Sequence, residues 1–149
     1  MIIRVQTDDF DVSKVNAELQ RGRSDTGAIV NFIGLVRDLA DDKLFQMTLE
    51  HYPGMTEKAL QTIAQQANQR WQVQDLAIIH RVGELKPADQ IVMVSVLSAH
   101  RKDAFDACEF IMDYLKTDAP FWKKEISESG SSWVESKKCD ADARNQWEK

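Results

Sequence analysis

Two long apolar segments, residues 73–82 and 90–99, constrain the fold of this chain more than any other feature of its sequence. Both are rich in Val, Ile and Leu, which favour buried strands. The stretch between them, GELKPAD, contains the turn-forming residues Gly83, Pro87 and Asp89. The sequence therefore predicts a β-hairpin made of these two segments.

The remaining segments follow the two periodicities of regular secondary structure. Apolar residues at helical spacing predict helices at 11–21, 55–71 and 101–117. Short apolar or alternating runs predict further strands at 1–7, 28–36, 44–50, 121–126 and 132–136. The last two flank the turn-forming stretch SESGS, so we expect a terminal hairpin. This order of elements is typical of an α+β fold with a mainly antiparallel sheet and flanking helices.

Length and composition bound the organisation of the chain. With 149 residues, 43% of them hydrophobic, it is large enough to bury a core without disulfides or metals. No repeat and no linker divides it. We therefore expect a single domain over 1–149, with a polar, loosely held tail at 137–149.

Charge and cysteine usage exclude several classes of protein. A net charge of −5 argues against a nucleic-acid partner, because proteins that track phosphates concentrate surplus Lys and Arg on one face. Cys108 and Cys139 form neither a CxxC pair nor a disulfide framework, and Cys108 is expected in the core. The chain shows no signal peptide and no membrane-spanning run. We therefore expect a cytoplasmic protein with no membrane contact.

Basic residues occur where predicted elements end, which is where sites are often built. Arg37 follows a predicted strand, and His100 with Arg101 stands at the start of the last predicted helix. The N-terminus of a helix attracts anions such as phosphate through its free N–H groups and its dipole. The plain alternatives are that Arg37 pairs with nearby acids and that His100 and Arg101 are simply solvated.

Lys116, Lys123 and Lys124 lie around Pro120, which ends the last predicted helix. Lys123 and Lys124 are adjacent on a predicted strand and point to opposite faces, so at most one shares a pocket with Lys116. We expect it to be Lys123. A lysine whose pKa is lowered by burial or by neighbouring cations becomes a base or a nucleophile at neutral pH. The alternative for Lys116 is an ordinary cation that stabilises the helix C-terminus.

Metal and nucleotide chemistry find no support in the sequence. Neither His51 nor His80 has a second ligand at HxxxH or HxH spacing. The six glycines form neither GxGxxG nor GxxxxGKS/T. We therefore expect no metal and no bound cofactor.

Five segments of the chain recur, in the same order, in one known family. They are GLVR at 34–37, LEHYPGMTEK at 49–58, HRVGEL at 80–85, SAHR at 98–101 and FIMDYLKTDAPFWKKE at 110–125. The last is the most specific, because it joins a helix end, a proline and two lysines in a fixed order. Through these segments the chain resembles the large, catalytic subunits of molybdopterin synthase over most of its length.

The resemblance implies an α/β-hammerhead fold and a sulfurtransferase of molybdenum cofactor biosynthesis. Such a subunit converts cyclic pyranopterin monophosphate, also called precursor Z, to molybdopterin. The sulfur would come from the C-terminal Gly-Gly thiocarboxylate of a small ubiquitin-like subunit. Two large subunits would form the homodimer core of a heterotetramer.

The resemblance also assigns site residues. Carried over residue by residue, the family's functional positions fall on Arg37, His100, Arg101, Lys116 and Lys123, with Lys124 beside them. All six are expected to bind the substrate. Lys116 and Lys123 are also expected to be catalytic, assisting proton transfer and stabilising charge as sulfur adds and oxygen leaves.

The chain departs from the family pattern in two places. Leu35 stands where some members carry a basic residue, and the loop DLADDK at 38–43 lacks a common glycine. Lys137 stands where some relatives have an arginine, and it is a further candidate to complete the pocket from the neighbouring subunit. Two other interpretations stay open: a non-catalytic adaptor that binds a ubiquitin-like tail, and an enzyme acting on another phosphorylated heterocycle.

Overall fold

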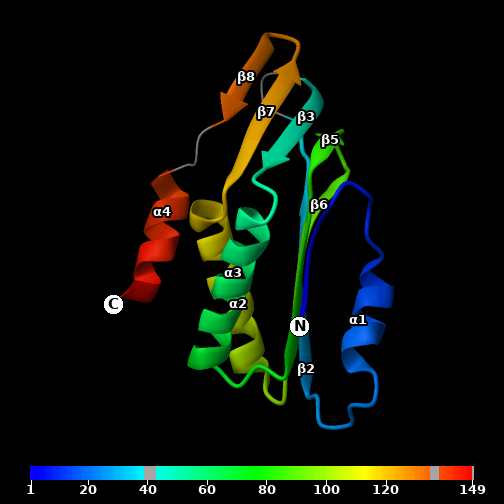
Figure 1. Cartoon of the computed structure of the whole chain (residues 1–149), viewed down its shortest axis with the longest axis vertical. Helices are drawn as coiled ribbons and strands as arrows, with labels where there is room; N and C mark the ends of the chain where they lie inside the picture. The colour runs from blue at the N-terminus through cyan, green and yellow to red at the C-terminus, as the bar shows by residue number, and fades with distance from the viewer. Residues whose placement is uncertain (39–42, 135–137, 149) are drawn as a thin grey trace.

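The computed structural model describes residues 1–38, 43–134 and 138–148 and contains two four-stranded sheets (Figure 1). In chain order the elements are β1 (Ile2–Gln6), α1 (Val12–Gln20), β2 (Ala28–Leu35), β3 (Leu44–His51), α2 (Met55–Arg70), β4 (Asp75–Arg81), β5 (Gly83–Leu85), β6 (Gln90–Ser98), α3 (Arg101–Asp118), β7 (Phe121–Ser127), β8 (Gly130–Val134), α4 (Lys138–Asn145) and η1 (Gln146–Glu148). The first sheet has the order β1-β4-β6-β2 and the second β5-β3-β7-β8.

The predicted hairpin of 73–82 and 90–99 is confirmed as the centre of the first sheet. β4 pairs antiparallel with β6, from Asp75 opposite Leu97 to His80 opposite Val92. β1 adds in parallel to β4, and β2 adds antiparallel to β6 at the opposite edge. The connection between β4 and β6 is more than a turn, because it contains β5, which pairs with β3 in the second sheet.

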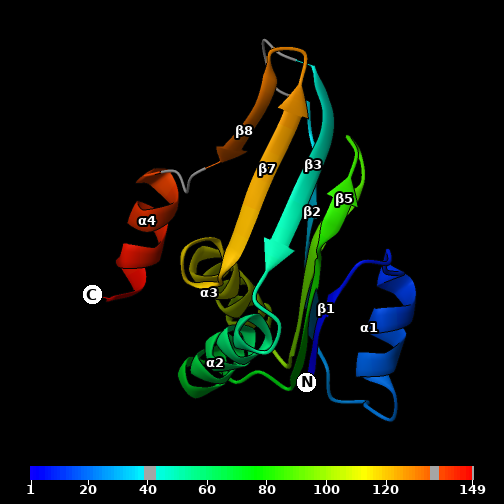
Figure 2. The same cartoon turned by 45° about the horizontal axis from the view of Figure 1, so that its top comes forward.

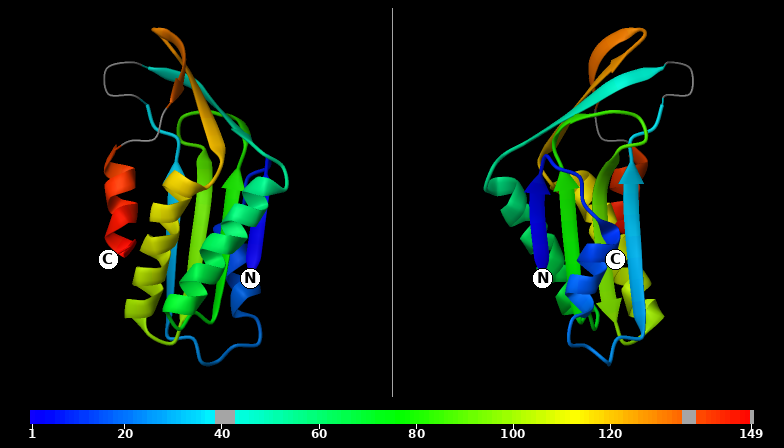
Figure 3. Two further views of the ribbon diagram at one scale, coloured as in Figure 1. Left: turned by 60° about the vertical axis from the view of Figure 1, so that its left-hand side comes forward. Right: turned by 90° about the vertical axis from the view of Figure 1, so that its right-hand side faces the viewer.

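Helices cover both faces of the first sheet, as the two views of Figure 3 show. On one face, α2 and α3 pack against alternate strand residues such as Ile78 and Val94. On the other, α1 packs against the intervening residues, which include Ile79 and Met93. Burial on both faces explains why the two central segments read as continuous apolar runs instead of alternating ones.

The second sheet extends beyond one end of the first (Figures 1 and 2). The predicted terminal hairpin is confirmed as β7 and β8, which pair antiparallel. β3 pairs with β7 and β5, and not with β2, its neighbour in sequence. The α+β class and the mainly antiparallel pairing are confirmed, since β1 with β4 is the one parallel pair among the described strands.

The polar C-terminal stretch forms α4 and η1, which the sequence did not predict. Arg144 pairs with Asp118 at 2.8 Å (Nε to Oδ1), and Trp147 donates its Nε1–H to Asp113 Oδ2 at 2.8 Å. Both acids belong to α3. Polar contacts and one tryptophan hold α4 and η1 in place. These two elements therefore lack the apolar stripe by which a sequence pattern would reveal a helix.

Candidate functional site

Lys116 and Lys123 meet where α3 passes into β7. Lys116 lies in the last turn of α3, and two residues, Ala119 and Pro120, separate that helix from β7. The pKa of Lys123 is lowered to about 8, first because burial removes water from its ammonium group. The charge of Lys116 and a side-chain hydrogen bond with Lys116 lower it further. At neutral pH, Lys123 is therefore much closer to losing its proton than an ordinary lysine.

Strand alternation separates Lys123 from Lys124, as expected from the sequence. Lys123 lies opposite Leu49 of β3 and Val134 of β8 on the face that reaches Lys116. Lys124 lies opposite Trp133, with its Nζ 5.8 Å from the centre of the indole ring. Lys124 therefore belongs to the other face of the second sheet and does not share the site of the two lysines.

His80 lies buried beside the lysine pair, a neighbour that the sequence did not reveal. Its ring stacks on Phe121 with centroids 3.8 Å apart, and its Nδ1 lies 2.8 Å from the carbonyl oxygen of Arg81. Burial lowers the pKa of His80 to about 4, and the charges of Lys123 and Lys116 add to this. The imidazole is thus neutral at pH 7. The sequence signal was only a lone histidine in an apolar strand, which usually means core.

Two carboxylates partly offset the positive charge around Lys123. Asp140 of α4 and Glu125 of β7 both raise its pKa, against the larger effects of burial and of Lys116. Asp140 was not a predicted site residue, because α4 was not predicted. The C-terminal helix therefore contributes to the electrostatics of the lysine pair.

His100 and Arg101 lie at the opposite end of the same helix. His100 stands at the N-cap position of α3 without a side-chain capping bond, and Arg101 is the first residue of the helix; both side chains are exposed. The 18 residues of α3 span about 27 Å at 1.5 Å per residue. Within one chain, the structure therefore does not bring His100 and Arg101 to Lys116 and Lys123.

The backbone before His100 is held rigidly. The buried Ser98 hydroxyl donates to Gln72 O at 2.8 Å and accepts from the His100 N–H at 3.3 Å. Gly27 N donates to Ser98 O at 3.0 Å, and a Cβ on Gly27 would lie 2.0 Å from the carbonyl oxygen of Ala99. Only glycine allows this approach, and it fixes the strand end from which α3 begins.

Arg37 lies toward the lysine end of the molecule. It follows β2, which runs in the same direction as α3, so the exit of β2 and the C-terminus of α3 share one end (Figure 3). Its side chain is exposed. Residues 39–42 of the loop DLADDK and the candidate Lys137 lie outside the described residues.

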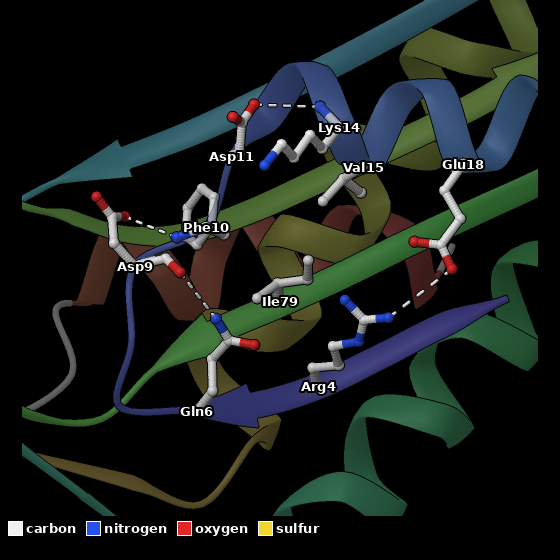
Figure 4. A pocket seen from close by; sticks show the side chains of 9 residues that line it. All are labelled: Arg4, Gln6, Asp9, Phe10, Asp11, Lys14, Val15, Glu18 and Ile79. Atoms are coloured by element: carbon white, nitrogen blue, oxygen red, sulfur yellow. Dashed lines mark hydrogen bonds and ion pairs between the residues drawn. The ribbon is translucent and has the colours of Figure 1, made fainter.

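A cavity of about 310 Å³ lies elsewhere, between α1 and the strands β1 and β4 (Figure 4). Two of its charged groups have partners within the cavity wall: Arg4 pairs with Glu18 at 3.8 Å, and Asp11 accepts from the Lys14 N–H at 3.1 Å. It contains none of the predicted site residues.

Three further observations restrict the chemistry. Cys108 is buried in the core as predicted, and burial raises the pKa of its thiol to about 12, so it is not a nucleophile. Over the described ranges, His, Cys, Asp and Glu nowhere gather in a group that could hold a metal ion. In the same part of the chain, every helix is too short or too polar to cross a bilayer.

Comparisons with known proteins identify the family of the chain. The model of the MoaE protein family matches residues 5–118. A molybdopterin synthase catalytic subunit from Ralstonia nicotianae is 55% identical over 146 residues, which is 97% of this chain and 83% of the relative. The solved MoaE protein from Burkholderia ambifaria superposes with a TM-score of 0.86 at 53% identity, covering 99% of this chain and 98% of that one.

A more distant solved structure has the same fold. It is a complex of subunits 1 and 2 of the molybdopterin-converting factor from Helicobacter pylori, with a TM-score of 0.75 at 16% identity over 92% of each chain. The family match covers most of the chain, and the near relatives cover almost all of it. The resemblance seen in the five sequence segments is thereby confirmed, and the chain belongs to the MoaE family.

Proposed function

We propose that this chain is the catalytic subunit of a molybdopterin synthase. It is a sulfurtransferase that converts precursor Z to molybdopterin in molybdenum cofactor biosynthesis. The observation that carries the proposal is the contact of Lys116 with Lys123, whose pKa is lowered, in a chain about half identical to named catalytic subunits. A pair of cations at a strand and helix junction suits an anionic substrate and the proton transfers of sulfur exchange.

The two lysines divide the work. Lys123, with a pKa of about 8, passes between its charged and neutral forms near physiological pH and therefore suits a proton-transfer role. Lys116 is exposed and supplies a positive charge that stabilises the negative charge developing as sulfur adds and oxygen leaves. The chain supplies no sulfur nucleophile of its own, because Cys108 is buried with a raised pKa.

The sulfur arrives on a partner, a small ubiquitin-like subunit whose C-terminal Gly-Gly carries a thiocarboxylate. The solved Helicobacter pylori complex of the two converting-factor subunits supports such a partner. A thiocarboxylate is an anion on an extended tail, and the lysine pair offers it a complementary charge. We place this reaction in the cytoplasm, with no metal or cofactor held by this chain.

We propose further that two copies form a homodimer and complete each other's sites. His100 and Arg101 lie a helix length from the lysines, so a shared site needs them from a second copy. β2 is an edge strand without charge or proline, and it exposes Phe32 and Leu35. Antiparallel contact between two such edges would bring the Arg37 end of one copy to the His100 end of the other.

A reconstitution tests the function. The purified chain is mixed with precursor Z and the thiocarboxylated small subunit, and dithiolene formation is followed through the fluorescent oxidised pterin. We expect product that disappears when this chain is omitted. A stable complex with the partner but no product would favour the adaptor. Failure of precursor Z to bind, where another phosphate ester binds, would favour a different substrate.

A further inference from the structure

The spacing of the two lysines depends on a short joint, residues 119–121. Lys116 is fixed on α3 and Lys123 on β7, and only Ala119 and Pro120 link the two elements. Phe121, the first residue of β7, pairs with His51 at the end of β3. A small change in the angle of this joint moves Lys123 relative to Lys116.

Thr56 holds the joint from the side of α2. Its side chain is fully buried, and its hydroxyl donates to the carbonyl oxygen of Pro120 at 3.1 Å. The same hydroxyl accepts the N–H of Tyr52 at 3.1 Å, and the Thr56 N–H donates to Tyr52 O at 2.9 Å. One hydroxyl therefore ties the joint to the start of α2 and to the segment that leaves β3.

His80 holds the joint from the first sheet. Its ring lies nearly parallel to Phe121, with an angle of 18° between the planes. Because the carbonyl oxygen of Arg81 can only accept, Nδ1 carries the proton and donates to it, and this bond fixes the orientation of the ring. The stack joins β4 of the first sheet to β7 of the second at the residue that begins the lysine strand.

We infer that Thr56 and His80 are positioning residues, which clamp the joint 119–121 from two sides and thereby set the contact between Lys116 and Lys123. Neither needs to touch the substrate. The inference rests on the proposed function insofar as the lysine pair performs the chemistry. The geometry of the clamp itself does not depend on which substrate is bound.

The charged groups around the clamp determine the pKa of Lys123, so a change in the joint can be measured through that pKa. Lys123 faces Lys116 from α3, Asp140 from α4 and Glu125 from its own strand. His80 faces Lys123, Lys116 and His51. If the joint relaxes, Lys116 moves away and water enters, so the two main causes of the lowered Lys123 pKa weaken together.

The test compares Thr56→Val with Thr56→Ser, and His80→Ala with His80→Phe. Valine keeps the volume of threonine without its hydroxyl, and phenylalanine keeps an aromatic ring that can stack. Two readouts are taken: the pKa of Lys123, from NMR titration of ¹³Cε-labelled lysine assigned with Lys123→Arg, and the single-turnover rate between pH 6 and 10.

We expect T56V and H80A to raise the pKa of Lys123 by about one and to slow turnover at pH 7 about tenfold. T56S and H80F should keep both values near those of the wild type. An unchanged Lys123 pKa in folded T56V and H80A would overturn the inference. The titration needs no substrate, so failure of the wild type to make molybdopterin would refute the proposed function without altering this readout.

Discussion

The two ends of α3 carry the same sign of charge in opposite settings. At its C-terminus, Lys116 meets Lys123 beside the buried His80, and the pKa values of Lys123 and His80 are lowered. At its N-terminus, His100 and Arg101 are exposed to solvent. Burial and neighbouring cations shift the pKa values at the C-terminal end of α3. The N-terminal end offers only the affinity of a helix start for anions.

The difference shows how the work is divided. Proton transfer needs a perturbed group, and desolvation within one chain provides it at the lysine end. Holding a phosphate needs charge and N–H groups, which an exposed helix start already has. We therefore expect damage at the lysine end to abolish turnover, and damage at the His100 end to weaken substrate binding.

Replacing Lys123 with alanine should have the largest effect. We expect a single-turnover rate lower by about 1,000-fold, since a positioned proton-transfer group contributes 10²–10⁴-fold. Binding of the small subunit, measured by calorimetry, should weaken much less than the rate, because Lys116 still offers a positive charge to its tail. A K123A variant that keeps more than a tenth of the wild-type rate would remove the functional contrast between the two ends.

Replacing Arg101 with alanine should have an intermediate effect of a different kind. Loss of a charge-assisted contact to phosphate should weaken substrate binding by about 10–100-fold. The rate at saturating substrate should change much less. The contrast would be broken if R101A lowered the saturated rate as strongly as K123A and left the KM for precursor Z unaltered.

Protonation of His80, which lies beside the two lysines, should destabilise the folded chain in acid. Its pKa is about 4 in the folded chain against 6.5 ordinarily, so stability is full above pH 6.5 and is lost as the pH falls toward 4. The wild type should lose about 3 kcal/mol more than His80→Phe between pH 7 and pH 4. Urea unfolding at several pH values measures this.

His100→Phe is the matched control at the other end of α3, because His100 is exposed. It should leave the pH dependence of stability as in the wild type. If the free energy of unfolding depended on pH equally in the wild type and in His80→Phe, protonation of the buried histidine would not destabilise the folded chain. That result would contradict the lowered pKa of His80.

Replacing Lys124 with alanine should have the smallest effect. Lys124 lies over Trp133 on the far face of the second sheet, and an exposed cation–π contact contributes only about 0.5–1 kcal/mol. We expect a rate within about twofold of the wild type. Steady-state kinetics on K124A and K116A measures this. A larger loss of rate in K124A than in K116A would show that the substrate binds on the Lys124 face of the second sheet.

Local pattern predicted much of this fold. Apolar period and turn residues identified the pair β4 and β6, the helix α3 and the hairpin of β7 and β8. Alternation indicated that only one of Lys123 and Lys124 reaches Lys116, and the lysine we expected, Lys123, is the one that does. These features depend on neighbours close in sequence, which is why a sequence pattern contains them.

What the sequence did not reveal depends on long-range packing. β2 and β3 follow one another yet belong to different sheets, and α4 is held to α3 by polar contacts. Thr56 and His80 are 64 and 41 residues from their partners Pro120 and Phe121, and nothing local marks them. Whether Arg37, His100 and Arg101 join Lys116 and Lys123 in one site likewise depends on contacts that no local pattern contains.

The most direct test of the account uses a mixed dimer. Arg101→Ala and Lys123→Ala chains are coexpressed with two different affinity tags, and the dimer carrying both tags is assayed at substrate concentrations where each pure variant is nearly inactive. If each site takes its lysines from one copy and Arg101 from the other, one site of the mixed dimer is intact, and activity should recover to about half of the wild type. Activity that stays at the level of the two pure variants would contradict a site shared between copies.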